Sequence, residues 1–226
     1  MKYNVIEVKE RVIADNDRVA AAQRARLQGK GIYFINLMGS PGAGKTSVLI
    51  RTIEALRDRF RIAVMEADVD SAVDAETISR LGVPVIQLHT AGLCHMDADM
   101  TARGMEALME QEQGAPFDIL ILENIGNLVC PAEFDVGAAK RVMILSVPEG
   151  DDKPLKYPLM FEVSDVVLVN KIDTKEIFDF DEERFRENVR MRNPQAEIFP
   201  LSARTGEGME AWFAWLAQEA ERGVRK

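Results

Sequence analysis

The sequence predicts an α/β fold with a doubly wound, mostly parallel β-sheet, and three observations lead to this prediction. Six apolar runs rich in Ile, Val and Leu alternate with segments of helical periodicity, as expected for parallel strands covered on both faces. The first run ends in a glycine-rich turn with the spacing of a P-loop, residues 39–46. The chain has 226 residues, of which 47% are apolar, and this suits one substantial core. We therefore expect a P-loop NTPase domain at residues 32–226, preceded by a helical appendage at residues 1–31.

Each element has its own signal in the sequence. In residues 1–31, Asn16 or Asp17 could cap a helix that continues to Leu27 and ends at the glycines that follow. Apolar runs then predict strands at Ile32–Leu37, Ile62–Glu66, Val83–Leu88, Ile119–Glu123, Val142–Val147, Val166–Val169 and Ala196–Pro200. Helices are expected at Ser47–Arg57, Asp74–Leu81, Asp97–Gln113, Pro154–Phe161, Asp181–Arg192 and Gly208–Arg222. Such sheets bind ligands at the carboxyl ends of their strands, so we expect the functional residues at that edge.

The charge balance and the length of the apolar runs exclude some classes of binding partner. The 28 basic and 37 acidic residues give a net charge of −9. Duplex DNA and anionic membranes both require a basic face, so we expect neither nucleic acid nor a membrane as the main partner. The sequence has two cysteines and no apolar run near the length of about 20 residues that crosses a bilayer. We therefore expect a cytoplasmic chain with reduced thiols.

The glycine-rich turn predicts a phosphate cradle. Its pattern is G-x-x-x-x-G-K-T, in which successive backbone N–H groups converge on a diphosphate. Lys45 would reach the β- and γ-phosphates and serve catalysis there, while the Thr46 hydroxyl would bind Mg²⁺. A surface turn could match this pattern by chance, but the strand before it and the helix after it are the context that a true site requires. The expected phosphate-binding residues are Gly39, Ser40, Gly42, Ala43, Gly44, Lys45, Thr46 and Ser47.

A second motif predicts guanine as the base. The sequence N-K-I-D at Asn170–Asp173 follows a strand, and the Asp173 carboxylate can accept from both guanine N1–H and the 2-amino group. Lys171 would lie over the base or brace the cradle. Residues 202–204 follow the next strand, and their backbone N–H can donate to guanine O6. N-K-I-D could also be an ordinary solvated turn that contains an Asp by chance. Together with the P-loop and residues 202–204, however, it favours a guanine-binding motif, and hence GTP and GDP as ligands. The expected base-binding residues are Asn170, Lys171, Asp173, Ser202, Ala203 and Arg204.

Two acidic strand ends predict a Mg²⁺ site and a hydrolytic centre beside the cradle. Asp68 and Glu123 could hold the metal ion directly or through water. Gly126 could bring its N–H to the γ-phosphate in a switch loop. Asp70 and Asp74 are alternatives for orienting the attacking water, although Asp74 could equally be a helix cap. No residue stands out as an arginine finger, so we expect slow intrinsic turnover, with acceleration by a partner or by dimerisation.

Three soft ligands fall in loops on the γ-phosphate side: Cys94, His95 and, beyond the second acidic strand end, Cys130. Two thiolates and an imidazole suit Zn²⁺ or Ni²⁺ and not Mg²⁺. A single cysteine is more often a small buried apolar residue, but the chain has only two Cys and two His, and three of these four gather here. Three ligands leave the site incomplete, which permits a labile metal, completion by a second subunit, or a further ligand from His89 or Asp99. The methionine series Met96, Met100, Met105 and Met109 could resemble a track of thioether ligands, but packing of a helix against the core explains it better.

Five motifs together resemble one known family. They are Gly39–Thr46, Gly92–Ala98, Glu123–Pro131, Glu149–Pro158 and Asn170–Asp173. From about residue 30 to its end, the chain resembles the hydrogenase nickel-incorporation GTPases of the HypB family. The resemblance implies a GTPase of the SIMIBI class, which includes the signal-recognition-particle and urease-accessory GTPases. It also implies a GTP-dependent homodimer that delivers Ni²⁺ to the large-subunit precursor of nickel–iron hydrogenase, with the nickel metallochaperone HypA as a partner.

The same resemblance implies roles for particular residues. Cys94, His95 and Cys130 would be the metal ligands. The stretch Glu149–Lys153 would lie near the nucleotide and the dimer interface, where Lys153 would contact the base or the other subunit. Some members of the family carry a cysteine-rich nickel motif or a histidine-rich tract at the N-terminus. This sequence has neither, so we expect only the switch-linked metal site.

We expect GTP and Mg²⁺ to order the Asp68 and Glu123 loops and thereby to change the affinity of the soft ligands for metal. Other readings stay open. A urease-type nickel GTPase would be expected to carry a Cys-Pro-His triplet, where this sequence has Cys94-His95 and a distant Cys130-Pro131. A regulatory GTPase switch would control a protein partner, with cysteines that are only structural. A metal-storage protein would need the nucleotide only for folding.

Overall fold

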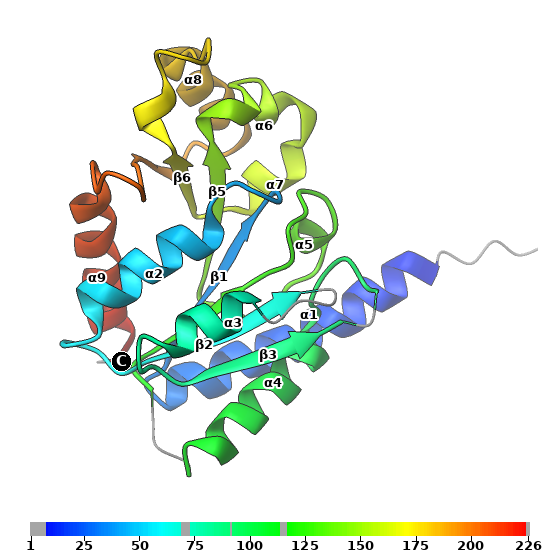
Figure 1. The fold of residues 1–226 in the computed structure, drawn as a ribbon. Helices are drawn as coiled ribbons and strands as arrows, with labels where there is room; N and C mark the ends of the chain where they lie inside the picture. Colours follow the sequence, from blue (N-terminus) through cyan, green and yellow to red (C-terminus); the bar gives the residue numbers. More distant parts are fainter. Residues whose placement is uncertain (1–7, 69–72, 91, 114–116, 225–226) are drawn as a thin grey trace, which may run out of the picture.

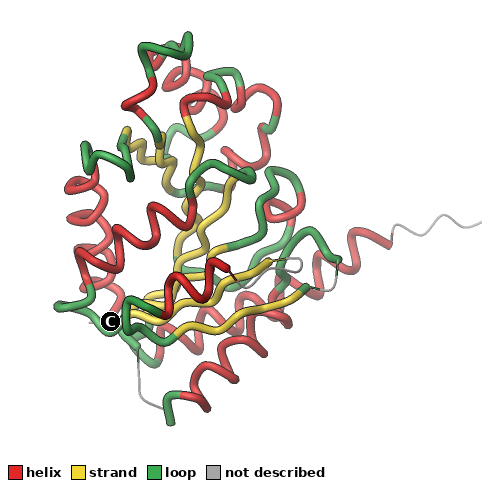
Figure 2. Tube along the Cα trace, in the orientation of Figure 1, coloured by secondary structure: helices red, strands yellow, loops and turns green. Residues whose placement is uncertain are grey.

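The computed structural model describes residues 8–68, 73–90, 92–113 and 117–224, whose path is drawn in Figures 1 and 2. Within these residues, seven parallel strands form one sheet in the order β3-β2-β4-β1-β5-β6-β7. The strands are β1 (Tyr33–Gly39), β2 (Ile62–Asp68), β3 (Val85–His89), β4 (Ile119–Glu123), β5 (Lys140–Ser146), β6 (Val166–Asn170) and β7 (Glu197–Pro200). The predicted doubly wound sheet is confirmed, and each predicted strand lies within two residues of the observed bounds.

Helices cover both faces of this sheet. Their bounds are α1 (Val8–Gly29), α2 (Lys45–Leu56), α3 (Val73–Ser79), α4 (Ala98–Gln111), α5 (Cys130–Glu133), α6 (Lys153–Lys156), α7 (Pro158–Val163), α8 (Glu182–Arg192) and α9 (Met209–Val224), with 3-10 turns η1 (Val147–Glu149) and η2 (Ile172–Thr174). Side chains of α2, α3 and α9 share one core with the sheet, and those of α1, α4, α5, α7 and α8 pack on the other face. No helix in the described ranges is long and apolar enough to cross a membrane.

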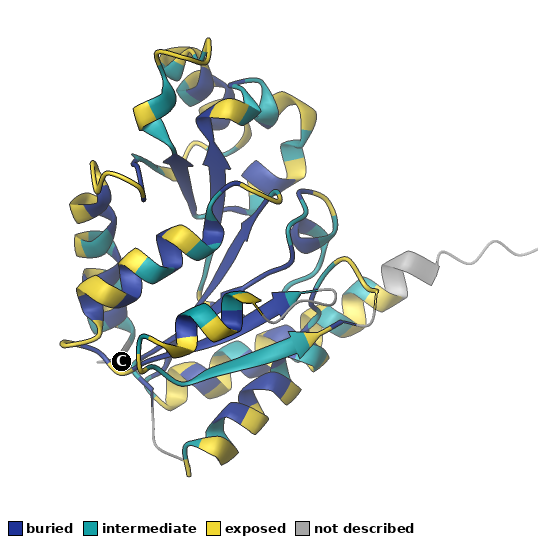
Figure 3. Ribbon diagram, viewed as in Figure 1, coloured by how far each residue is buried: buried dark blue, intermediate teal, exposed yellow. Residues whose placement is uncertain are grey.

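Alternation along β1 explains the two layers. Ile35 and Leu37 lie in the core that contains α2 and α9, whereas Phe34 and Met38 face the helices on the other side. A strand covered on both faces needs apolar side chains at successive positions. These strands could therefore be predicted from the continuous apolar runs in the sequence. Figure 3 shows the central strands buried, while the edge strand β3 is of intermediate exposure.

The first helix begins earlier than predicted. Because α1 already includes Asn16 and Asp17, neither residue is its N-cap. The Asn16 amide has partners from distant parts of the chain instead. Its Oδ1 accepts from the N–H of Ala98 at 2.9 Å, and its Nδ2 donates to the carbonyl of Asp135 at 2.9 Å. A cap-forming residue type inside a helix is explained here by these tertiary hydrogen bonds.

The helix predicted at Pro154–Phe161 is two short helices. The break falls at Tyr157, whose φ and ψ of −128° and 59° are not helical. Pro158 accounts for the break, because proline disfavours the helical conformation in the residue before it. The four-residue helix α5 was not predicted, since so short a segment carries no periodic signal.

The carboxyl ends of the strands meet at one edge, where the candidate residues gather. β1 leads through the P-loop into α2. β2 and β4 are neighbours, with Glu66 opposite Glu123 in the register. β5 and β6 pair so that Ser146 lies opposite Asn170. The sheet therefore brings the predicted phosphate, acidic and N-K-I-D motifs to a shared rim.

Candidate functional site

The turn between β1 and α2 is held in its cradle shape by glycines and by one distant amide. Gly42 and Gly44 have φ angles of 76° and 97°, in the left-handed region that residues with a side chain rarely adopt. A Cβ on Gly44 would also collide with Nδ2 of Asn170. That nitrogen donates to the carbonyl of Ala43 at 2.9 Å. The N-K-I-D motif and the P-loop are thus in direct contact.

Lys45 opens α2 and is almost fully buried. Its Nζ donates to the carbonyl of Ser40 at 3.3 Å. Burial lowers the pKa of this ammonium, and the nearby carboxyls of Glu123 and Asp74 oppose the shift. The Ser40 hydroxyl in turn donates to Glu149. A polyphosphate in the cradle would offer the ammonium several oxygens in place of one long hydrogen bond.

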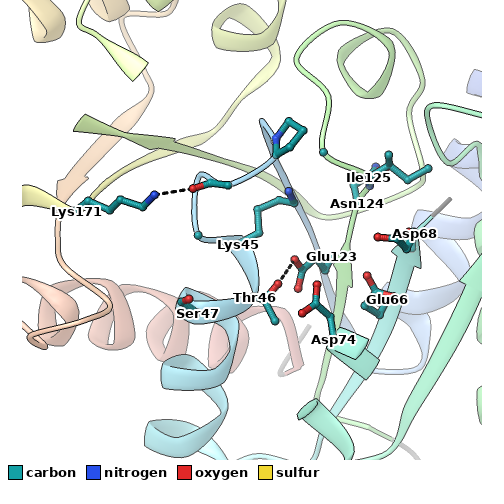
Figure 4. Close-up of a pocket in the computed structure, with 15 residues that line it drawn as sticks. Lys45, Thr46, Ser47, Glu66, Asp68, Asp74, Glu123, Asn124, Ile125 and Lys171 are labelled. Atoms are coloured by element: carbon teal, nitrogen blue, oxygen red, sulfur yellow. Dashed lines mark hydrogen bonds between the residues drawn. The ribbon is translucent and has the colours of Figure 1, made fainter. Parts of the chain in front are cut away.

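A cavity of about 590 Å³ opens beside the cradle, with acidic groups along one wall (Figure 4). Thr46 Oγ1 donates to Oε1 of Glu123 at 2.7 Å. The other oxygen of Glu123 and one oxygen of Glu66 are buried and have no hydrogen-bond partner among the described residues. Burial raises the pKa of Glu66 to about 8 and the pKa of Glu123 to about 7. Two such carboxyls beside a hydroxyl fit a hard divalent cation, which would supply both the missing partner and the counter-charge.

Asp68 and Asp74 line the same cavity, so the structure brings both predicted acids to the cradle. Asp74 lies in the first turn of α3. Asp70, the other candidate for orienting water, lies outside the described residues. Gly126 also lines the cavity, packed so closely against Pro41 that a Cβ would lie 2.9 Å from its ring. Glu66 was not predicted as a ligand, although it lies two residues before Asp68 on the same strand and lines this cavity.

A second hollow of about 480 Å³ adjoins the cradle on the side of β6. Asp173 lines it, and Ser202 Oγ donates to Oδ1 of this carboxylate at 2.7 Å. Lys171 Nζ donates to the carbonyl of Gly42 at 2.7 Å, so this lysine braces the cradle. The hollow is lined by Gly44, Ser47, Asn170, Lys171, Asp173, Thr174, Ala203 and Arg204. Its position beside the phosphate cradle is that of a base pocket.

Two backbone N–H groups beside this hollow have hydrogen-bond partners within the chain. The backbone N–H groups of residues 202–204 were expected to face guanine O6. The Ala203 N–H instead donates to Oδ1 of Asn170 at 3.1 Å, and the Ser202 N–H donates to the carbonyl of Glu207 at 2.8 Å. These two groups are occupied in holding the loop, because a buried N–H needs a partner.

The three soft ligands come together at the same edge. The Sγ atoms of Cys94 and Cys130 are 3.0 Å apart, and Nδ1 of His95 lies 3.9 Å from Sγ of Cys94. The ligand atoms of all three residues lie within 4.8 Å of one another. Cys94 is exposed and Cys130 is half-buried, so neither thiol lies in the core. Two sulfurs and one nitrogen at this spacing fit a borderline or soft transition metal ion.

The surroundings of the cluster favour the metal-binding form of the imidazole. The His95 ring stacks on Phe134, with centroids 3.9 Å apart and planes at 19°. Burial lowers the pKa of His95, although Asp97 opposes the shift. A neutral imidazole keeps a lone pair for a metal ion. The neighbouring Cys94 thiol raises the pKa of Cys130.

Other candidate ligands lie elsewhere. Among the described residues, the cluster contains neither His89 nor Asp99. His89 lines a hollow between β3 and α4, and Asp99 is exposed in the first turn of α4. Asp97 caps α4, accepting from the N–H of Met100. Met96 and Met105 are buried in the core, and Met100 and Met109 pack against it, which confirms the packing interpretation of the methionine series.

Lys153 lines neither hollow of the single chain. Its Nζ lies over the Tyr157 ring, 5.3 Å from the centroid. Glu149 accepts from Ser40 of the P-loop, in the stretch that the resemblance places near the nucleotide. Two further residues that were not predicted contact the thiol cluster: Phe134 stacks on the imidazole, and Asn127 donates to the Cys94 carbonyl. They lie within or next to the motifs already quoted, but no spacing rule distinguishes these two from ordinary loop residues.

Comparisons with known proteins extend this picture. The chain matches the family model described as CobW/HypB/UreG, nucleotide-binding domain, over residues 33–200. It is 46% identical over 221 residues to the hydrogenase maturation factor HypB of Azotobacter vinelandii, covering 98% of this chain and 71% of that protein. The crystal structure of HypB from Helicobacter pylori in complex with nickel matches with a TM-score of 0.87 and 36% identity, over 93% of this chain and 97% of the other. The signal recognition particle receptor FtsY from Elizabethkingia anophelis matches with a TM-score of 0.54 at 15% identity, over 86% of this chain and 68% of that one, and so shares the fold alone.

Proposed function

The chain belongs to the HypB family of nucleotide-binding proteins, and from this premise we propose that it is a GTP-hydrolysing metallochaperone that delivers nickel to the large-subunit precursor of nickel–iron hydrogenase. GTP or GDP with Mg²⁺ binds in the cradle, and Ni²⁺ or Zn²⁺ binds at Cys94, His95 and Cys130. One observation carries the proposal: a short segment from Glu123 to Cys130 joins both sites. Its first residue accepts from Thr46 of the cradle at 2.7 Å, and the thiol of its last lies 3.0 Å from that of Cys94.

In the nucleotide half of the proposal, each group has one task. The backbone of residues 39–47 holds the phosphates, and Lys45 stabilises charge that develops on them during hydrolysis. Thr46, Asp68 and Glu123 hold Mg²⁺, directly or through water. The N–H of Gly126 meets the γ-phosphate, and Asp74 orients the attacking water.

In the metal half, nucleotide state changes the arrangement of the thiols. Glu123 would hold Mg²⁺ and the Gly126 N–H would meet the γ-phosphate, so the segment that continues to Cys130 would change its position relative to Cys94 with the nucleotide state. Since the three ligands leave a tetrahedral site incomplete, the resident ion is labile. Linkage requires that the factor by which GTP changes Ni²⁺ affinity equals the factor by which Ni²⁺ changes GTP affinity.

Replacing Cys130 by Ala is expected to lower Ni²⁺ affinity by at least about a hundredfold, because even residues that only support metal ligands cost 10–100-fold when they are removed. GTP-analogue binding should persist, since Cys130 lies outside the cavity beside the cradle. Isothermal titration with Ni²⁺, in the presence of GDP or of a non-hydrolysable GTP analogue, measures both quantities. A variant that keeps wild-type Ni²⁺ affinity would remove the metal site from the proposal and favour a regulatory GTPase with structural cysteines.

The two histidines supply a matched control for that experiment. His95 belongs to the cluster, whereas His89 lies in a hollow between β3 and α4. His95→Ala should therefore weaken Ni²⁺ binding, and His89→Ala should leave it at the wild-type value. Equal losses in the two variants would show that the cluster is not the binding site.

Slow turnover of the monomer and GTP-dependent dimerisation belong to the same proposal. No arginine lines the 590 Å³ cavity in the described part of the chain, so an activating charge must come from outside it. Leu155 lies in α6, which begins at Lys153, and Leu159 lies in α7; the two residues are 47% and 42% exposed. Large apolar side chains exposed four residues apart are a natural contact surface for a second copy of the chain. In the dimer, Lys153 would reach the base or the partner's residues.

The double substitution Leu155→Ala and Leu159→Ala is expected to weaken the GTP-bound dimer by about tenfold to a hundredfold. Full burial of a leucine side chain contributes about 1.5–3 kcal/mol, and each of these leucines, already about half buried in the single chain, has about half of that left to gain at an interface. Sedimentation velocity with a non-hydrolysable GTP analogue measures the dimer dissociation constant. Met191→Ala on α8 is the control, since Met191 is 66% exposed but lies on a different helix. A dimer as tight as wild type in the double variant would move the interface elsewhere.

The partners and location in this proposal come from family membership. They are the metallochaperone HypA, as the source of nickel, and the hydrogenase large-subunit precursor, as its acceptor. Cytoplasmic location fits the chemistry, because the two thiols must stay reduced to bind metal. Reconstituted transfer of nickel from HypA to the precursor, compared between the wild type and Cys130→Ala, tests the delivery step directly.

A further inference from the structure

Asn127 touches three parts of the shared edge. Its backbone N–H donates to the carbonyl of Gly39 at 3.0 Å, within an isolated antiparallel bridge. Its Nδ2 donates to the carbonyl of Cys94 at 3.2 Å. Its Oδ1 accepts from the N–H of Val129 at 2.8 Å. One residue therefore contacts the first residue of the phosphate cradle, the loop of one cysteine and the turn that leads to the other.

We propose that Asn127 is the positioning residue that couples the thiol cluster to the phosphate cradle, so that the Cys94 loop follows the nucleotide state through the Asn127 amide. This inference rests on the proposed function, because it names the group that regulates metal binding at the same site. Asn127 itself need not touch the metal or the nucleotide. It acts through Gly39 on one side and through the main chain of Cys94 on the other.

Chain continuity alone connects only one cysteine to the nucleotide. Cys130 follows Glu123 along the chain, so it moves with the cradle in any variant. Cys94 lies 36 residues before Cys130, in the loop between β3 and α4. In the described part of the chain, the polar contacts between that loop and the Glu123–Cys130 segment are the thiol pair and the hydrogen bond from Asn127. Of these two polar contacts, the hydrogen bond from Asn127 is the one that reaches the main chain of the Cys94 loop.

The local geometry explains why an asparagine stands here. Oδ1 closes a turn on the N–H two residues ahead, a pattern typical of Asn and Asp. That hydrogen bond fixes the orientation of the amide, so Nδ2 is held toward the Cys94 carbonyl. Serine can close the same turn more weakly but carries no second group that reaches the other loop. Asn127→Ser therefore removes the tie between the loops while the turn remains.

The test compares Ni²⁺ affinity with GDP and with a non-hydrolysable GTP analogue, in the wild type and in Asn127→Ser. We expect the variant to bind Ni²⁺ about tenfold to a hundredfold more weakly. More decisively, the ratio between its two affinities should fall toward one. The reciprocal effect of Ni²⁺ on GTP-analogue affinity should shrink by the same factor. GTP-analogue affinity measured without metal should equal that of the wild type, because the Asn127 N–H that holds Gly39 belongs to the backbone and survives substitution.

Asn193→Ala is the matched control. The Asn193 Oδ1 accepts from the N–H of Gln195 at 3.0 Å, and its Nδ2 donates to the carbonyl of Ser164 at 2.9 Å. The pattern of contacts is the same as at Asn127, but Asn193 lies at the opposite edge of the sheet, before β7 begins. This variant should keep both Ni²⁺ affinities and their ratio. Thermal unfolding of each variant without ligands confirms that the fold is retained.

The outcomes separate the inference from the function it rests on. In one outcome, the ratio of the two Ni²⁺ affinities differs from 1 in the wild type and is the same in Asn127→Ser. This result overturns the role of Asn127 and leaves the proposed nickel GTPase function intact. An equal loss of Ni²⁺ affinity in both nucleotide states, with the ratio unchanged, shows that Asn127 only shapes the thiol cluster, and this also overturns the coupling role. Equal affinities in the wild type itself overturn the coupled metal site, and the inference with it.

Discussion

Replacing Asp173 by Asn is expected to turn a protein that selects GTP into one that selects XTP, with a change in preference of about 10⁴-fold. The carboxylate has two acceptor oxygens for the N1–H and 2-amino donors of guanine. Asparagine keeps one acceptor and places an amide donor against the 2-amino group, where xanthine has a carbonyl. Ser202 holds the side chain at 2.7 Å, so it cannot simply turn away. Competition between GTP and XTP for a fluorescent nucleotide measures the preference.

The control for this experiment is Asp179→Asn, which makes the same chemical change on an exposed residue outside the hollow. It should keep the wild-type preference for GTP. If Asp173→Asn still selects GTP over XTP, the hollow beside β6 does not hold the base, and the N-K-I-D motif has only its observed role of bracing the P-loop.

Replacing Lys45 by Ala is expected to lower GTP turnover by about a thousandfold, because the ammonium is the donor aimed at the phosphates from within a partly desolvated site. The fold should survive the change. In the nucleotide-free chain, Lys45 makes one hydrogen bond of 3.3 Å to the Ser40 carbonyl, and burial already lowers its pKa. Removing the side chain therefore relieves a buried charge at little cost in contacts. Phosphate release under single-turnover conditions measures the effect, with thermal unfolding as the test of fold.

Lys140→Ala is the matched control for the lysine. Lys140 forms an ion pair with Asp165 at 2.9 Å, at the amino end of β5 and far along the strand from the cradle. Its loss should leave turnover unchanged. Turnover of Lys45→Ala near the wild-type value would mean that the ammonium does not stabilise the transition state, and that hydrolysis depends on other groups or takes place at another site.

The sequence carries strong signals for the sheet and for its motifs. Continuous apolar runs such as Ile119–Glu123 indicate strands buried on both faces, because their length and their content of β-branched residues suit a strand better than a helix. The P-loop could be predicted because Gly42 and Gly44 have positive φ angles, which residues with a side chain rarely adopt, so glycine marks these positions in the sequence. Parallel strands then place Asp68 and Glu123 at one edge without further information. The gathering of Cys94, His95 and Cys130 follows from the same topology.

What the sequence could not supply is the set of contacts that depend on side-chain geometry. Asn16 has the residue type of a helix cap, yet its amide bridges α4 and Asp135 from inside α1. The apolar pattern on either side of Tyr157 predicted one continuous helix, but Pro158 disfavours the helical conformation at Tyr157 and breaks it. The backbone N–H groups of residues 202–204 were expected to face guanine, and nothing in the sequence shows that the one of Ala203 donates to Asn170 in this structure. Each of these outcomes depends on a partner more than 30 residues away or on a single backbone angle. Distant partners and single angles leave no periodic pattern in the sequence, so they could not be predicted from it.

The placement of Cys94 on the surface has a consequence for how a metal ion could leave. If an ion is bound here as proposed, a donor atom from an incoming protein would approach it from the solvent side while His95 and Cys130 still held it. Substitution can then proceed one bond at a time through a mixed complex shared by giver and receiver. The ion would never have to pass through bulk water, and no part of the hydrophobic interior would have to open for it to go.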